Sequence, residues 1–307
     1  MLKRAVVILL FLPCWLMAQE RPGSTAANFL KLDVSPRGAA MGGSFISVAE
    51  GAEAAFYNPA SLAEMNGWDV VFNHNEWFAD INHEYLSIAH NFGSTIGSFA
   101  ISVNGLYTDE MLVRTPLQPD GTGETFFAGS YLVGLSYARM MTHRVSIGGS
   151  VNYLHIGLFD EFTSNAFTFD LSLTYNTGFH GHRFALGIYN FGRNIKFVNE
   201  DYPMPTNFIF GMSINGLEKQ DYTVILSLTG QKPNDLDPLA QAGVEIDIIN
   251  ILALRGGYVF GHDVARYSFG AGLQTKQSGQ FQIRANYSYN DFTTLGASHR
   301  IGLGFSF

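Results

Sequence analysis

Five ionisable residues lie at positions where the sequence predicts extended strands, and their side chains are those that could do chemistry. They are Asp170, Glu245, Asp247, Arg255 and Arg284. In each predicted strand the charged residue falls on the side opposite to the apolar residues, so we expect it to point into a shared interior. Two interpretations remain open. The charges could contact or guide a ligand, or they could form a structural network, since buried charges must be paired.

Other candidates for catalysis or metal binding are weak. His180 and His182 flank a glycine at a predicted turn, where two imidazoles would hold a metal only loosely, and we favour a solvated turn. The loop at Asp120–Gly123 has too few oxygen ligands after it for a calcium site. No serine has a nucleophile-elbow context, and no glycine-rich loop leads from a strand into a helix. The sequence therefore predicts no enzyme, no metal and no cofactor.

The elements that position these charges are predicted to be strands. In the last residues Ile301, Leu303, Phe305 and Phe307 fall on one side of an extended chain, and small residues fall on the other. An aromatic last residue on an alternating strand resembles the assembly signal of bacterial outer-membrane barrels, which gives Phe305 and Phe307 that role. The alternation recurs in about 14 segments from residue 67 onward, with lengths typical of tilted membrane strands. The predicted fold class is all-β, a transmembrane antiparallel barrel of about 14 strands.

Connection lengths predict the orientation of this barrel. The turns that follow even-numbered predicted strands are tight, whereas the longest connections, at 109–124, 199–205 and 232–238, follow odd-numbered ones. Outer-membrane barrels have short periplasmic turns and longer external loops. We therefore expect both termini in the periplasm.

The amino terminus and the charge balance fit export. Lys3 and Arg4 precede an apolar run that ends near Ala18, which predicts a signal peptide at 1–18. The only cysteine, Cys14, lies inside it, so the mature chain forms no disulfide. Removal of Lys3 and Arg4 leaves 16 basic against 26 acidic residues, a net charge of −10. This balance argues against nucleic-acid binding.

The segment at 19–66 differs from the rest of the mature chain because it lacks alternation. It is rich in alanine and glycine, and the passages at 26–32 and 49–56 predict two short helices. Several of its residues require particular backbone shapes or turns, or belong to the same motifs: Gly38, Met41, Gly42, Gly43, Asn58, Pro59 and Ala60. We expect a plug or hatch in the barrel mouth or, alternatively, a packing segment that seals one end. The predicted organisation is a signal peptide at 1–18, a hatch at 19–66 and a barrel at 67–307.

These motifs also carry a family resemblance. The stretches that match are Phe29–Leu32, Arg37–Phe45 and Ala54–Ala63, followed by Ala242–Glu245, Ala253–Tyr258 and Ser268–Gly272. In this order and spacing they resemble the PorV/PorQ family of outer-membrane proteins, relatives of the FadL-type barrels. The resemblance implies a 14-stranded barrel with a hatch. It further implies a role in the type IX secretion system of Bacteroidetes, where PorV-like members bind cargo that carries a C-terminal secretion domain.

Two functional hypotheses follow from the resemblance and the pattern. In the first, the protein is a non-enzymatic accessory of protein secretion, and its partners are outer-membrane lipid, the barrel-assembly machinery, secretion-system components and cargo C-terminal domains. In the second, it is a FadL-like channel for hydrophobic small molecules. The predicted inward residues are polar and glycine-rich, which favours the first hypothesis because a hydrocarbon needs an apolar path.

Overall fold

The computed structural model describes residues 22–307, apart from 159–161, 198, 262–263, 265 and 276–280. The predicted signal peptide, with Cys14, lies outside the described residues. No helix in the described part of the chain is long and apolar enough to span a bilayer.

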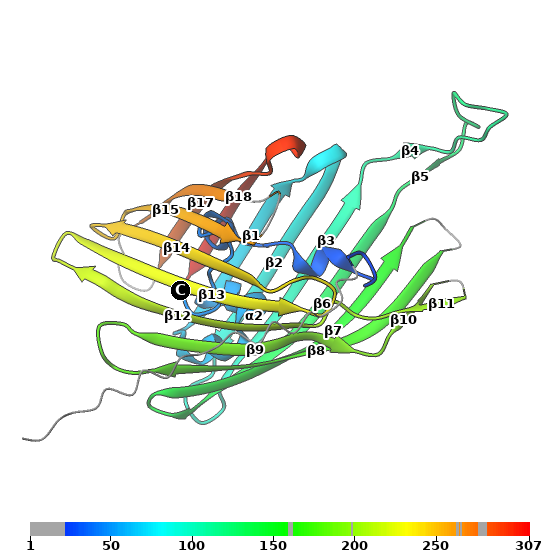
Figure 1. Cartoon of the computed structure of the whole chain (residues 1–307). Helices are drawn as coiled ribbons and strands as arrows, with labels where there is room; N and C mark the ends of the chain where they lie inside the picture. The colour runs from blue at the N-terminus through cyan, green and yellow to red at the C-terminus, as the bar shows by residue number, and fades with distance from the viewer. Residues whose placement is uncertain (1–21, 159–161, 198, 262–263, 265, 276–280) are drawn as a thin grey trace, which may run out of the picture.

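The chain forms a closed antiparallel barrel of 14 strands, which confirms the predicted fold class (Figure 1). Each strand pairs with its neighbours in sequence order, and β1 closes the barrel against β18. The barrel strands are β1 (Trp68–Glu76), β2 (Ile81–Asn91), β3 (Ser98–Thr108), β6 (Gly129–Thr142), β7 (Val145–Gly157), β8 (Thr163–Asn176), β9 (Arg183–Gly192), β12 (Asn207–Glu218), β13 (Tyr222–Pro233), β14 (Leu239–Ile248), β15 (Leu252–Phe260), β16 (Tyr267–Gln274), β17 (Gln282–Asp291) and β18 (Ala297–Ser306).

The two rims of the barrel differ. We call the rim where β1 begins and β18 ends the terminal rim; its described connections are short, as at 143–144, 219–221 and 249–251. The opposite end, the loop rim, carries the longer connections. They include the short helices η4 (Phe78–Asp80) and η5 (Thr293–Leu295) and two small hairpins. These hairpins are β4 (Met111–Leu112) with β5 (Thr125–Phe126), and β10 (Ile195–Phe197) with β11 (Glu200–Tyr202).

The alternation of side chains gives the barrel an apolar outer wall. On β18, Ile301 and Leu303 are exposed, whereas Gly302 between them and Gly304 after them are buried against the interior. The same pattern on the other strands places large aliphatic and aromatic side chains outside, as a wall in contact with hydrocarbon requires. At the terminal rim the ring of Trp68 stacks on His90, with a centroid distance of 4.2 Å, and on Phe307 at 6.3 Å.

The amino-terminal segment lies inside the barrel and packs against its inner wall (Figure 1). Its elements are η1 (Asn28–Lys31), α1 (Pro36–Ala40), η2 (Gly51–Glu53), α2 (Ala54–Tyr57) and η3 (Pro59–Glu64). We call residues 24–66 the hatch. Its apolar side chains, with Met41, Phe45 and Leu62 fully buried, form most of the main core cluster inside the barrel. The two helices predicted at 26–32 and 49–56 occur as shorter helical turns, η1 and the pair η2 and α2.

Candidate functional site

The hatch fits the barrel because inward-facing glycines leave room for its backbone. A Cβ atom on Gly257 of β15 would overlap the backbone of Met41 and Gly42, and one on Gly148 of β7 would lie 2.5 Å from the amide nitrogen of Ala60. Gly42 and Gly43 adopt φ angles of 66° and 76°, in the left-handed region that favours glycine. The glycine-rich motifs of the hatch and the inward glycines of the wall therefore form one packing surface.

Polar bonds fix the hatch to the barrel at several points. The carboxamide nitrogen of Asn58 donates to the Thr174 hydroxyl on β8 at 2.8 Å and lies 2.8 Å from the Ile46 carbonyl oxygen. The backbone nitrogen of Ala60 donates to Ser172 Oγ at 2.9 Å. Pro59 between them begins η3. This is the structural setting of the Asn58-Pro59-Ala60 motif, a turn that joins the hatch to the wall.

On the opposite side of the barrel the wall donates to backbone carbonyls around the first glycine motif. Ser268 Oγ donates to the Ala40 carbonyl at 3.1 Å, and Ser227 Oγ donates to the Ser44 carbonyl at 2.8 Å. Gly38, one turn earlier, packs against Phe45 and Tyr57 within the hatch. The bond to Ala40 satisfies a carbonyl that the end of the short helix α1 leaves unpaired, and the bond to Ser44 satisfies one in the turn that follows.

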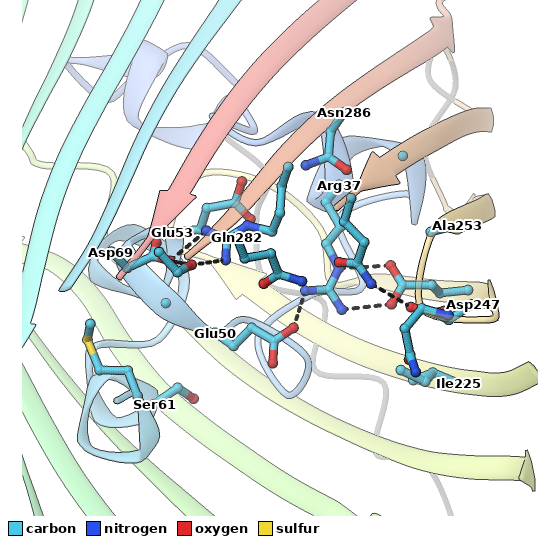
Figure 2. A pocket seen from close by; sticks show the side chains of 18 of the residues that line it. Arg37, Glu50, Glu53, Ser61, Asp69, Ile225, Asp247, Ala253, Gln282 and Asn286 are labelled. Carbon is cyan, nitrogen blue, oxygen red and sulfur yellow. Dashed lines mark hydrogen bonds and ion pairs between the residues drawn. The ribbon is translucent and has the colours of Figure 1, made fainter. Parts of the chain in front are cut away.

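The main ionic cluster joins hatch and wall through Glu245. The Arg37 guanidinium on α1 donates to both Glu245 oxygens, at 2.8 and 2.7 Å, and to Glu50 at 2.5 Å. Arg255 on β15 also donates to Glu245 and, at 2.8 Å, to Asn286. Figure 2 shows Arg37 with its bonds drawn to Glu50 of the hatch and toward the wall strands. Two guanidinium groups therefore share one buried carboxylate.

A second cluster surrounds Asp69 on β1. One oxygen of Asp69 accepts from the backbone nitrogen of Ala52 in the hatch at 2.8 Å. The other accepts from Arg284 and from Ser306, each at 2.6 Å. Arg284 is thus paired, but with an acid outside the predicted set of five. The structure separates it from the Glu245 cluster.

The remaining two predicted charges have no cationic partner among the described residues. Asp170 accepts from Asn152 Nδ2 and from the backbone nitrogen of Asn190, both at 2.7 Å. Asn190 has a φ of 56° and forms the extra residue of an irregularity in the pairing of β8 with β9. Asp247 accepts from Gln274 Nε2 at 3.2 Å and from the backbone nitrogen of Asn250 at 3.0 Å. The network interpretation would pair each of them with a cation, whereas these two carboxylates accept hydrogen bonds from amide groups.

The paired charges line a cavity of about 620 Å³ that lies at the terminal rim. Arg37, Glu50 and Glu53 enter it from the hatch, and Asp247 enters it from the wall (Figure 2). Glu245 and Arg284 of the wall also line it. Sequence reasoning did not select Arg37, Glu53 or Asp69. Arg37 and Glu53 lie in the segment without alternation, so the sequence did not indicate which way their side chains point. The described residues contain no cluster of histidine and carboxylate side chains suited to a metal ion.

A second cavity, of about 420 Å³, lies at the loop rim and is mostly apolar. Its wall includes the mutually packed rings of Trp77, Phe78 and Phe292, with centroid distances of 4.7 to 5.1 Å. The hatch contributes Lys31, Leu32, Asp33 and Gly42 to this cavity, whereas other hatch residues line the terminal cavity, and the two cavities share no lining residue. The hatch therefore separates an apolar cavity at one rim from a charged cavity at the other.

Comparison with known proteins gives a likeness of fold. No family model and no curated protein matches the chain. Among solved structures the CymD monoaromatic hydrocarbon channel has a TM-score of 0.56 at 14% identity, over 89% of this chain and 96% of that one. The Ralstonia pickettii toluene transporter TbuX has a TM-score of 0.51 at 15% identity over 89% and 97% of the two chains. A Pseudomonas aeruginosa FadL homologue has 0.52 at 10% identity over the same shares.

These identities show the fold alone, and the PorV/PorQ resemblance depends on the sequence motifs. The protein is accordingly a 14-stranded antiparallel β-barrel with the fold of FadL-like outer-membrane proteins.

Proposed function

We propose that the protein is an outer-membrane barrel of the PorV/PorQ type that acts, without enzymatic chemistry, as an accessory of protein secretion. In this proposal the loop rim faces the outside and the terminal rim, with both chain termini, faces the periplasm. Short periplasmic turns and longer outer loops are the usual arrangement in such barrels. The apolar wall contacts outer-membrane lipid. The barrel-assembly machinery recognises the C-terminal strand that carries Phe305 and Phe307. The partner is a secretion-system component or the C-terminal domain of a cargo protein.

The observation that carries the proposal is the hairpin of β4 and β5. It projects beyond the loop rim, at the upper right of Figure 1. Its apolar side chains face solvent: Leu117 at the tip is 93% exposed, and Leu112 and Phe127 are also exposed. Exposed apolar side chains on a projecting element are typical of surfaces that bind another protein.

The packing of the hatch supports binding rather than passage. The backbone of the hatch lies directly against wall glycines, and Arg37 shares Glu245 with the wall residue Arg255. Moving the hatch would separate these buried charges, which is costly. A segment fixed in this way favours a barrel that binds its partner at the loop rim.

Uptake of hydrophobic small molecules is the second candidate, as in a FadL-like channel. It is favoured by the apolar cavity at the loop rim and by the fold shared with proteins described as hydrocarbon channels and toluene transporters. It requires that the hatch move, because the cavity beyond it is lined by charge.

The decisive experiment compares Leu117→Asp with Gln118→Asp in the native cell. Both positions are exposed neighbours on the same hairpin, so both variants should fold equally well. The proposal predicts that only Leu117→Asp reduces crosslinking to a protein partner and lowers the amount of secreted cargo at the cell surface, by about tenfold or more. Uptake of toluene and of dodecanoate is measured in the same strains.

Unchanged secretion and crosslinking in both variants would show the secretion role to be wrong. Loss of hydrocarbon uptake on deletion of the whole protein, with secretion intact, would establish the second candidate instead.

A further inference from the structure

The terminal rim carries unpaired positive charge over two neighbouring turns. We call residues 139–144, at the turn between β6 and β7, and 177–182, at the turn between β8 and β9, the basic rim patch. The side chains of Arg139 and Arg144 are exposed, and within the described part of the chain neither forms an ion pair or a side-chain hydrogen bond. The imidazole of His143, next to Arg144, is exposed as well.

The charge of this patch is local. Neither of its two turns contains an acidic residue, and the adjoining turn at 91–97 contains none either. The connection at 109–124, at the other end of β3 and β6, instead carries four acids, Asp109, Glu110, Asp120 and Glu124, against the single Arg114. The two ends of these strands therefore differ in the sign of their charge, in a chain that is acidic as a whole.

The two turns of the patch are in contact. The backbone nitrogen of Asn176 donates to the Arg144 carbonyl oxygen at 2.8 Å, and a Cβ atom on Gly178 would lie 3.8 Å from Arg144 Nη2. The second turn is itself fixed to β12, because the Asn215 nitrogen donates to the His180 carbonyl oxygen at 2.9 Å. The Arg144 guanidinium therefore lies beside a turn that is held in place from both sides.

Arg139 belongs to the outer face of the barrel. The exposed residues Val133, Leu135 and Tyr137 precede it at alternate positions of β6, and its neighbour Ala138 is buried. A group that pairs with Arg139 must therefore lie outside the wall, at the edge of the surface that contacts hydrocarbon. A ligand in the lumen would not reach it.

Apolar side chains are exposed in the same two turns. Met141 is 58% exposed and Phe179 is 65% exposed. Basic and apolar side chains that lie together are typical of surfaces in the headgroup region of a membrane. An acidic polypeptide would supply charge but nothing for the apolar wall below Arg139. A phospholipid supplies both a phosphate, which arginine binds well, and acyl chains.

We propose that the basic rim patch binds an anionic phospholipid. Its phosphate pairs with Arg139 and Arg144, its glycerol region contacts Met141 and Phe179, and its acyl chains lie along the outer wall. The pairing fixes the terminal rim at the level of the headgroups. This inference rests on the membrane location in the proposed function and goes beyond it, because it assigns a lipid class to named side chains and does not depend on the secretion role.

The test titrates lipid into the purified full-length protein in non-ionic detergent and measures bound molecules by native mass spectrometry. The probes are dihexanoyl phosphatidylglycerol, dihexanoyl phosphatidylcholine and glycerol phosphate, which has no acyl chains. One arginine near an anionic lipid surface raises affinity about fivefold, so two should make phosphatidylglycerol bind about 30-fold more tightly than phosphatidylcholine. Glycerol phosphate should bind more weakly than phosphatidylglycerol by about tenfold or more, because it buries no apolar surface.

Matched variants separate the charge from the apolar contact. Arg139→Gln combined with Arg144→Gln should abolish the preference for phosphatidylglycerol and leave phosphatidylcholine binding unchanged. Arg114→Gln combined with Arg193→Gln removes the same charge at the loop rim and should keep the preference. Phe179→Ser should weaken both lipids by the same factor. All these side chains are exposed, so the variants should fold like the unchanged protein.

Four results would overturn the inference. The first is equal affinity of the unchanged protein for the two lipids. The second is a preference that survives in the variant without Arg139 and Arg144. The third is glycerol phosphate binding as tightly as phosphatidylglycerol, which would show an anion site that does not need a lipid. The fourth is hexaglutamate binding more tightly than either lipid, which would show that the patch takes an acidic polypeptide.

Failure of this inference can be told apart from failure of the proposed function. If phosphatidylglycerol is not preferred while Leu117→Asp still reduces partner crosslinking and secretion, only the lipid assignment is wrong. If Leu117→Asp changes nothing, the secretion role is wrong whatever the basic rim patch binds.

Discussion

Gly42 of the hatch packs its backbone directly on Gly257 of β15, so that a Cβ atom added to Gly257 would overlap the Gly42 nitrogen. Glycine is required at each of the two positions for a different physical reason. Gly42 has a φ of 66°, and Gly257 faces inward at the point of closest approach between hatch and wall. The contact is between two backbones, so no side chain can move aside to relieve an added methyl group.

Replacing Gly257 should therefore displace the hatch, whereas replacing its neighbour should not. We expect Gly257→Ala to destabilise the protein by about 1–3 kcal/mol, as overpacking does. A Cβ atom on Gly256 would meet Val244 at an ordinary 3.7 Å, so Gly256→Ala is the matched control. The measurement is the rate of proteolysis of residues 24–66 in the folded barrel. Equal rates in the two variants would contradict the tight packing.

Removing the shared carboxylate should leave the buried Arg255 without an anion and Arg37 with only the exposed Glu50. We expect Glu245→Gln to cost about 3–5 kcal/mol, because Arg37 and Arg255 both depend on it. Asp247→Asn, two residues along the same strand, should cost less than about 1 kcal/mol because that carboxylate is bound by amides. Urea unfolding in detergent or lipid measures both. A small effect at Glu245 would show that its charge is dispensable to the hatch.

Glu53 should make the stability of the hatch depend on pH. Burial raises the pKa of this carboxyl, against the opposing charges of Arg37 and Arg284. The folded state therefore binds its proton more tightly than the unfolded state. Stability is greatest below the unfolded pKa and falls as pH rises through the folded pKa. We expect Glu53→Gln to raise the melting temperature at pH 8 and to have less effect at pH 4. A lower melting temperature at pH 8 would contradict this sign.

The two sides of β13 should respond differently to a charge. Leu226 points outward and is 46% exposed, whereas Ile225 lines the charged cavity at the terminal rim. An arginine that faces lipid costs about 2–4 kcal/mol at the bilayer midplane and less near the interfaces. We therefore expect Leu226→Arg to lower the yield of folded barrel in lipid more than Ile225→Arg does. The reverse order would contradict the facing of this strand.

Sequence reasoning was strongest for the strands. The alternation at Ile301, Leu303 and Phe307 predicted the outer wall, and the strand count agrees with the observed barrel. Alternation is a local property that each strand shows by itself, because its two faces meet different surroundings. The irregularity at Asn190 was not predicted, since a single extra residue leaves the pattern on both sides intact.

The polar interior was predictable only in part. Glu245 and Arg255 were expected inside and do meet there, two strands side by side in register. Their third partner, Arg37, lies 208 residues from Glu245 in sequence. Asp170 was expected to face the interior, and the structure shows it buried there with amide groups as its hydrogen-bond donors.

The sequence by itself determined that the chain is a barrel with an apolar outside, a polar and glycine-rich inside, and a segment before the first strand that is not part of the wall. Only the tertiary structure decided how that segment lies within the lumen. It also placed Arg144 of one terminal-rim turn beside Gly178 of the next. The reason is that periodicity reports which side of a strand a residue occupies. Contacts between hatch and wall depend on barrel closure, which brings distant strands around one segment and has no local signature in the chain.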